Sequence, residues 1–138
     1  MARAKTDPEF VEEYEDVLQN IEFVIVWVHN QIPGLLDCHV EAALEALIVH
    51  YKAEQRGRVA APPTLDVPRA AVYHEIWRIC EWRLGRIRLE SERHDEQPAP
   101  KSADEIIACL GRVRKSVQRW NKRGGRQGYL SFIRKYVR

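Results

Sequence analysis

The sequence lacks the paired cysteines and the long apolar segments that mark secreted and membrane proteins. Its three cysteines, Cys38, Cys80 and Cys109, lie far apart and form no Cys-x-x-Cys pair. This pattern is typical of reduced thiols in a cytosolic protein. The first ten residues contain no apolar segment of the kind found in secretion signals. The longest apolar run, residues 23–28, is far too short to cross a bilayer. We therefore expect a cytoplasmic protein with no membrane association.

Motifs for metal binding and catalysis are also missing. The five histidines are scattered, and no His-x-x-x-His, His-Glu-x-x-His or Cys-x-x-Cys spacing occurs. No single helix face therefore offers two strong metal ligands. The Gly-x-x-x-x-Gly-Lys-Ser/Thr pattern of phosphate-binding loops is absent as well. These absences predict no metal, no cofactor and no catalytic residues, and they favour a binding function over an enzymatic one.

The charged residues are divided between the two ends of the chain. Residues 7–51 contain ten acids and no Lys or Arg, whereas residues 106–138 contain ten Lys or Arg and no acid. The formal net charge of +2 conceals this polarity. Such asymmetry indicates either that the two ends pair with each other inside the protein or that the basic end binds an acidic partner.

Apolar residues recur with the period of an α-helix in five segments. The first segment begins after Pro8 and ends before Pro33, and its all-round apolar end predicts a helix at the centre of a bundle. The second runs from Asp37, a fair N-cap residue, to Gly57, a typical C-cap residue. The third begins near Pro68, and its apolar pattern fades before a proline-containing linker near residues 95–101.

The last two helical segments follow that linker. Ser102 and Glu105 form a Ser-x-x-Glu capping box, which predicts the start of the fourth helix. The pair at residues 124–125, Gly-Gly, predicts its end and the beginning of a short fifth helix. Four aromatic residues here continue the apolar stripes and are predicted to face the core: Trp120, Tyr129, Phe132 and Tyr136.

The segments together predict an all-α fold. We expect one domain over residues 1–138, built as an up-and-down bundle of about five helices with no sheet. Flexible connections are expected near residues 58–67 and 95–101, which contain prolines and no apolar pattern. Because most apolar stripes are narrow and heptad-like, we also expect one face to be shared with a second copy in a homodimer.

A row of cations stands out on the fourth helix. Arg112, Lys115, Arg119 and Lys122 step by three, four and three residues, so they share one helix face. We call these four residues the cation row. No acid lies on the same helix face to neutralise them, so the row is expected to meet acids from the first two helices or an external anion such as phosphate.

Two further arginines extend the cation row toward the C-terminus. Arg123 and Arg126 flank the glycine pair at residues 124–125, and a third glycine follows at position 128. Glycines allow backbone N–H groups to turn toward an anion, and the start of a following helix would add its dipole. The alternative is an ordinary tight turn between two helices.

One short stretch resembles an enzyme motif. Arg69 and His74 are separated by four residues, a spacing similar to the Arg-x4–6-His motif of HEPN ribonucleases, which are small all-helical enzymes. The resemblance implies that Arg69 would steady a phosphate and that His74 would act in acid–base cleavage of RNA. Ala70 stands where the motif usually has a polar residue. The alternative is that His74 is a partly exposed side chain beside Trp77.

The sequence as a whole predicts a small non-enzymatic interaction or regulatory protein. Its partner would be a nucleic-acid backbone or an acidic protein, bound through six cations: Arg112, Lys115, Arg119, Lys122, Arg123 and Arg126. Two alternatives come from other classes of protein. One is an HEPN-like ribonuclease, and the other is a structural subunit that assembles acidic end to basic end.

Overall fold

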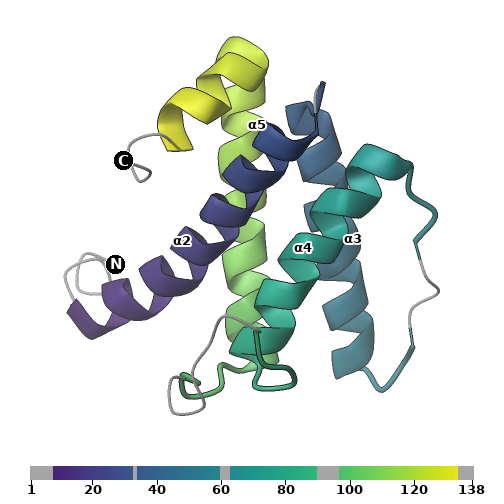
Figure 1. Cartoon of the computed structure of the whole chain (residues 1–138). Helices are drawn as coiled ribbons and strands as arrows, with labels where there is room; N and C mark the ends of the chain where they lie inside the picture. Colours follow the sequence, from purple (N-terminus) through teal and green to yellow (C-terminus); the bar gives the residue numbers. More distant parts are fainter. Residues whose placement is uncertain (1–7, 33, 60–62, 90–96, 134–138) are drawn as a thin grey trace.

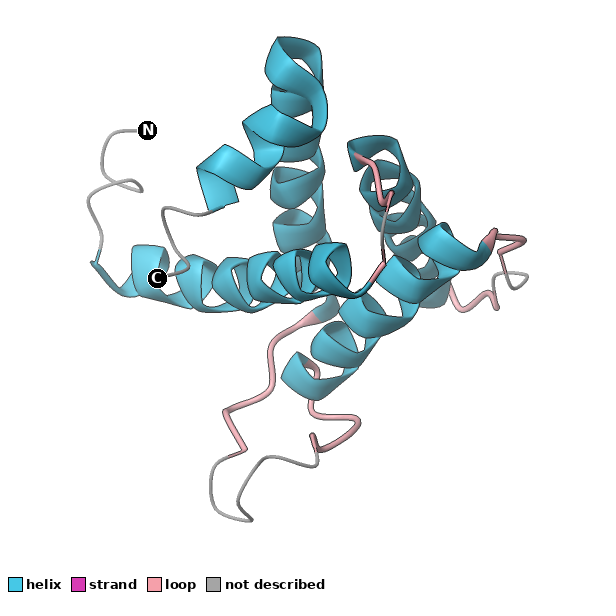
Figure 2. Ribbon diagram, turned by 45° about the horizontal axis from the view of Figure 1, so that its top comes forward, coloured by secondary structure: helices cyan, strands magenta, loops and turns pink. Residues whose placement is uncertain are grey.

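Four α-helices make up the part of the chain that the computed structural model describes, which is the backbone of residues 8–32, 34–59, 63–89 and 97–133. The described side chains are those of residues 17, 20–32, 34–59, 63–89 and 97–119. The helices are α2 (Pro8–Gln31), α3 (Asp37–Gln55), α4 (Val67–Arg83) and α5 (Ala103–Ile133). No strand occurs within these ranges, and Figure 2 shows only helices and loops. The predicted all-α class is confirmed.

The predicted count of five helices is wrong by one. The glycine pair at residues 124–125 does not end a helix, because α5 continues to Ile133. Glycine costs only about 1 kcal/mol relative to alanine inside a helix and keeps its backbone N–H and C=O groups. The last, yellow part of α5 turns sharply back from the green part (Figure 1), and glycines are a common cause of such bends.

The order in which the helices pack differs from that of an up-and-down bundle, where each helix lies beside the next one. Here the main contacts join α3 with α5 and α4, and α2 with α5 and α4. Helix α2 crosses α5 obliquely in Figure 1 and at a steep angle in Figure 2. The helical bundle is confirmed, but among the described residues α3 and α4 are the one successive pair with extensive contacts.

The predicted apolar stripes form the core. Within the described residues, the buried apolar side chains of α2, α3 and α5 recur mostly at steps of three or four, whereas α4 also buries the consecutive residues Ile79, Cys80 and Glu81. The largest fully buried side chains include Ile21 of α2, Leu44 and Tyr51 of α3, Ile76 of α4 and Leu110 of α5. The side chains of Trp120, Tyr129, Phe132 and Tyr136, which were predicted to face the core, lie outside the described residues.

The C-terminal half of α2 is not buried on all sides, contrary to the prediction from its apolar run. Ile21, Ile25 and Val28 face the core, whereas Phe23 is 42% exposed and Trp27 is 51% exposed. The reason is that α2 makes its main contacts on one side only, with α4 and α5. Two large aromatic side chains therefore remain on the surface.

Glycines end α3 and α4 in the same way. Gly57 has a φ of 70°, and Gly85 has a φ of 78°. After α4, Gly85 N–H donates to Trp82 C=O at 3.0 Å and Arg86 N–H donates to Glu81 C=O at 2.9 Å, the pattern of a Schellman motif. The C-cap of α3 is Arg56 rather than the predicted Gly57, although Gly57 follows directly in the left-handed conformation that ends the helix. The motif at Gly85 ends α4 earlier than its apolar stripe suggested.

The predicted helix starts are only partly correct. The capping box is confirmed, since Glu105 N–H donates to Ser102 Oγ at 3.2 Å and Ser102 N–H donates to Glu105 Oε1 at 3.2 Å. Asp37 was expected to cap α3, but the N-cap is Leu36. Asp37 is the first helical residue and is buried.

Candidate nucleic-acid interface

The cation row lies on α5, and three of its four side chains are described. Arg112, Lys115 and Arg119 are all exposed. The side chains of Lys122, Arg123 and Arg126 lie outside the described residues, although the backbone of α5 continues through these positions as helix. The helical period therefore brings three predicted site residues to one exposed face, and the other three belong to the later part of the same helix.

Acids of α2 and α3 reach the two flanks of the cation row. On one flank, Arg114 Nη2 lies 3.9 Å from Glu45 Oε1, and Gln118 Nε2 donates to Glu41 Oε1 at 2.8 Å. On the other flank, Arg112 lies near Glu22 of α2. Some cations of the basic end therefore lie near acids of α2 and α3. This is the internal pairing of the two ends that was one of the two predicted alternatives.

The middle of the cation row is different. Lys115 and Arg119 are exposed, and neither forms an ion pair with any acid among the described residues. They sit one helical turn apart between the two flanks that α2 and α3 cover. Two neighbouring cations with no acid beside them among the described side chains repel each other.

Glu22 marks the boundary between α2 and the cation row. Burial raises the pKa of Glu22 from 4.5 to about 7, and the nearby Arg112 guanidinium opposes the rise. The folded protein therefore keeps a proton on Glu22 between about pH 4.5 and pH 7, where the unfolded chain has released it. This contribution to stability is fully present below pH 4.5 and is lost as the pH rises through 7.

Replacing Glu22 with glutamine should remove this pH dependence, because the amide keeps the shape of the protonated acid. The free energy of unfolding of E22Q, relative to wild type, should rise by about 1–2 kcal/mol from pH 5 to pH 8, a value reduced for partial exposure. Urea denaturation at both pH values measures it. Glu45→Gln, at a side chain that is 60% exposed, controls for the loss of one acid. A difference between E22Q and wild type that stays constant with pH would contradict the raised pKa.

A polar network that the sequence did not reveal joins α3 to the end of α4. Tyr51 Oη donates to Glu81 Oε2 at 2.7 Å, and Arg86 Nη1 lies 3.4 Å from the same oxygen. Arg86 also binds Glu54, and this hydrogen bond holds the pKa of Glu54 below its usual range. His50 lies 3.7 Å from Glu54. These groups satisfy one another, so the network stabilises the fold without needing a ligand.

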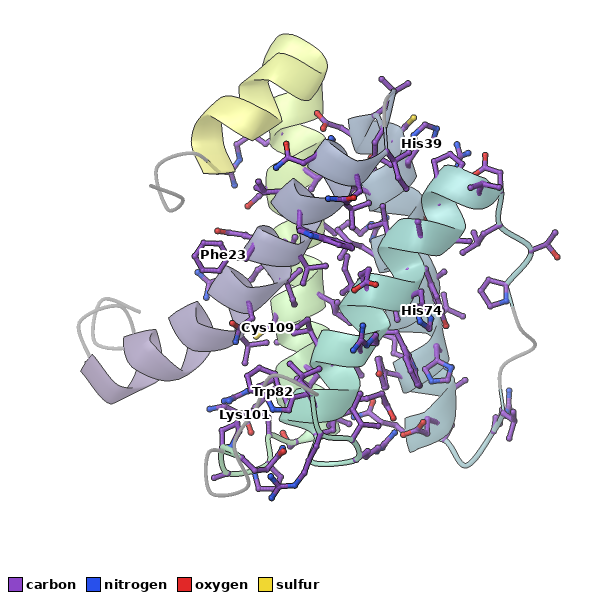
Figure 3. The ribbon with its side chains drawn as sticks, viewed as in Figure 1. Phe23, His39, His74, Trp82, Lys101 and Cys109 are labelled. Carbon is purple, nitrogen blue, oxygen red and sulfur yellow. The ribbon has the colours of Figure 1, made fainter. Side chains whose placement is uncertain are left out.

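The two residues of the HEPN-like spacing make separate contacts. Asp66 is the N-cap of α4, and its carboxylate accepts from the backbone N–H of Arg69 at 3.1 Å and pairs with the Arg69 guanidinium. His74 is exposed and stacks on Trp77, with ring centroids 6.0 Å apart. Figure 3 labels His74 on α4. The capping role of Asp66 explains the position of Arg69 without any catalytic function.

The described residues contain neither a metal centre nor a helix suited to cross a membrane. No group of three or more His, Cys, Asp or Glu side chains in this part of the chain could hold a metal ion. None of its helices combines the length and apolar character needed to cross a membrane. All three cysteines are free thiols, and burial raises the pKa of Cys109 to about 11.

Sequence reasoning missed one set of surface residues. Phe23 and Trp27 were assigned to the core with the rest of the apolar run, yet both are exposed. The signal was present in the spacing. Asn20 and Asn30 share the helix face of these two aromatics, and polar residues at that period indicate a face turned toward solvent.

Comparisons with protein-family models, with curated proteins and with solved structures found no match to this chain.

Proposed function

We propose that this protein is a non-enzymatic binding protein that engages the phosphate backbone of nucleic acid through the cation row of α5. The observation that carries the proposal is the exposure of Lys115 and Arg119 without an acidic neighbour among the described residues. Arg114, next to Lys115 in the chain, faces Glu45 instead. The described cations of α5 that lack an acidic neighbour, Lys115 and Arg119, therefore lie on one face of the helix.

The geometry of the cation row suits a chain of phosphates. The seven steps from Arg112 to Arg119 span about 10 Å of helix axis, a length that holds about three phosphates of one strand. Each phosphate contact releases a condensed counterion, which favours binding without any contact to a base. Binding of this kind is tolerant of sequence and weakens steeply as salt is added.

Changing Lys115 and Arg119 together to glutamine tests the proposal. The slope of log K against log salt should be about −3 to −4 for wild type with four contacts, and it should shrink by about 1.5–2 in the double variant. Fluorescence anisotropy with labelled DNA over a salt series measures both slopes. Thermal stability should hardly change, because both side chains are exposed.

A matched control variant also loses two positive charges, but at a surface away from the cation row. Lys52 and Arg56 are exposed on α3 and just after it, and K52Q/R56Q should leave the slope within about 0.5 of wild type. Equal losses in the two double variants would show that net charge alone governs binding. Binding that does not depend on salt would contradict the proposal. Failure to bind any nucleic acid at low salt would favour an acidic protein as the partner.

Fewer observations support the two alternative functions, a ribonuclease and a self-assembling subunit. The ribonuclease alternative relies on Arg69 and His74, whose contacts are with Asp66 and Trp77. Self-assembly of the acidic end on the basic end would need acids of a second copy to reach Lys115 and Arg119. Sedimentation velocity at low and high salt separates this alternative, because an assembly held by charge dissociates as salt increases.

A further inference from the structure

Acids from two neighbouring helices line the cation row on its two sides. On the α3 side, Glu45 Oε1 lies 3.9 Å from Arg114 Nη2, and on the α2 side, Glu22 lies near Arg112. Helices α2 and α3 both pack on α5 (Figure 1). The two acids differ in their surroundings, because the Glu45 side chain is 60% exposed whereas Glu22 is half-buried. Burial disfavours the charged form of an acid, so the charge of Glu22 depends on its place beside α5.

Few titratable groups surround Glu22 in the part of the chain that the structure describes. Arg112 of α5 is the charged side chain there that acts on Glu22, and α4, the other helix packed on α2, brings none to it. Cys109 lies one turn before Arg112 on α5, and burial raises the pKa of its thiol to about 11, so the thiol stays neutral. His29 follows two turns later on α2 and is buried. Glu22 and Arg112 therefore form a pair at the edge of the cation row.

The two protonation states of Glu22 give the cation row different charges. Burial raises the pKa of Glu22 from 4.5 to about 7. Below this pH the side chain carries a proton and does not offset the charge of Arg112. Above it the carboxylate lies near the guanidinium and offsets part of the attraction between Arg112 and a phosphate. A phosphate bound at Arg112 favours the protonated acid by the same free energy, because coupling between two sites is reciprocal.

We propose that Glu22 regulates the cation row by competing with nucleic-acid phosphate for Arg112, so that binding weakens as the pH rises from 6 to 8. This inference rests on the proposed function and adds a regulation of the same site. One phosphate contact contributes about 0.7–0.9 to the slope of log K against log salt. In about 0.1 M salt, the loss of one such contact weakens binding by about five- to eightfold. Ionisation of Glu22 should weaken binding by up to this factor.

Anisotropy titrations of a labelled DNA duplex at pH 6 and pH 8 test the inference. In about 0.1 M salt, the affinity of wild type relative to Glu22→Gln should fall by about fivefold between the two pH values. Glutamine keeps the shape of the protonated acid, and the comparison cancels the titration of the histidines, which both proteins share. The matched control is Glu45→Gln, which removes an acid from the other side of the row and should change affinity by the same factor at both pH values. Circular dichroism checks that each protein is folded.

Arg112→Gln gives a second readout that does not depend on a change in α2. This variant should bind the duplex about fivefold more weakly than wild type at pH 6, because one phosphate contact is gone. It should also lose most of the further weakening between pH 6 and pH 8, because Glu22 then has no guanidinium to compete for. A pH dependence that persists in full in Arg112→Gln would overturn the inference.

The outcomes for the two proposals are distinct. If wild type binds the duplex and K115Q/R119Q weakens binding, the cation row functions as proposed. If the affinity of wild type relative to Glu22→Gln is then unchanged or higher at pH 8, the regulation by Glu22 is wrong and the proposed function stands. If wild type binds no nucleic acid at low salt at either pH, both proposals fail.

Discussion

Replacing Tyr51 with alanine should lower the free energy of unfolding by about 3–5 kcal/mol, as for other large buried aromatics. Tyr51 is fully buried on α3, and its hydroxyl donates to the Glu81 carboxylate of α4 at 2.7 Å. Burial raises the pKa of Tyr51 above its usual range, so the hydroxyl remains a donor at neutral pH. The alanine variant loses the packing of the ring and also leaves a buried carboxylate with fewer donors. Urea denaturation at pH 7 measures the loss.

Tyr51→Phe separates the two contributions. The ring stays in place, and Glu81 keeps Arg86, whose Nη1 lies 3.4 Å from Glu81 Oε2. The expected loss is about 1–2 kcal/mol, the usual effect of removing one donor from a buried acceptor. If phenylalanine is as destabilising as alanine, the hydrogen bond to Glu81 matters more than the packing of the ring. If neither variant loses stability, the burial of Tyr51 is contradicted.

Replacing Gly85 with alanine should lower the free energy of unfolding by about 2–3 kcal/mol. Gly85 has a φ of 78°, a left-handed conformation that costs a residue with a Cβ about 1–2 kcal/mol. A Cβ at this position would also lie 2.9 Å from Pro100 Cγ. The connection after α4 would then have to shift, although Lys101 N–H is bonded to Arg83 C=O at 2.7 Å. Thermal and urea denaturation both measure the effect.

Gly57 supplies the matched control for this prediction. Its φ is 70°, yet a Cβ there would have nothing within 4 Å. Gly57→Ala should therefore cost only the left-handed conformation, about 1–2 kcal/mol. The difference between the two variants measures the close approach of Pro100 to Gly85. Equal losses would show that Pro100 moves aside freely.

The candidate site was predictable in part. The cation row was found from its spacing alone, because residues three and four apart share a helix face wherever the helix lies. Which of its cations meet internal acids depended on how α2 and α3 pack on α5. Arg114 faces Glu45 across 69 residues of sequence, and Gln118 bonds Glu41 across 77. No local pattern specifies contacts between segments so far apart.

The sequence by itself determined the class of the fold, the inward face of most helices and several of their ends. These features depend on interactions within a few residues: the apolar period, the capping box of Ser102 and Glu105, and the left-handed glycine after α3. The tertiary structure alone decided which helices became neighbours and how α5 continues past its glycine pair. It also decided that Phe23 and Trp27 stay exposed, because a side chain is buried only if another helix arrives to cover it. An apolar run such as residues 23–28 shows that burial is favourable, but the crossing of α2 over α5 determines which of its residues obtain it.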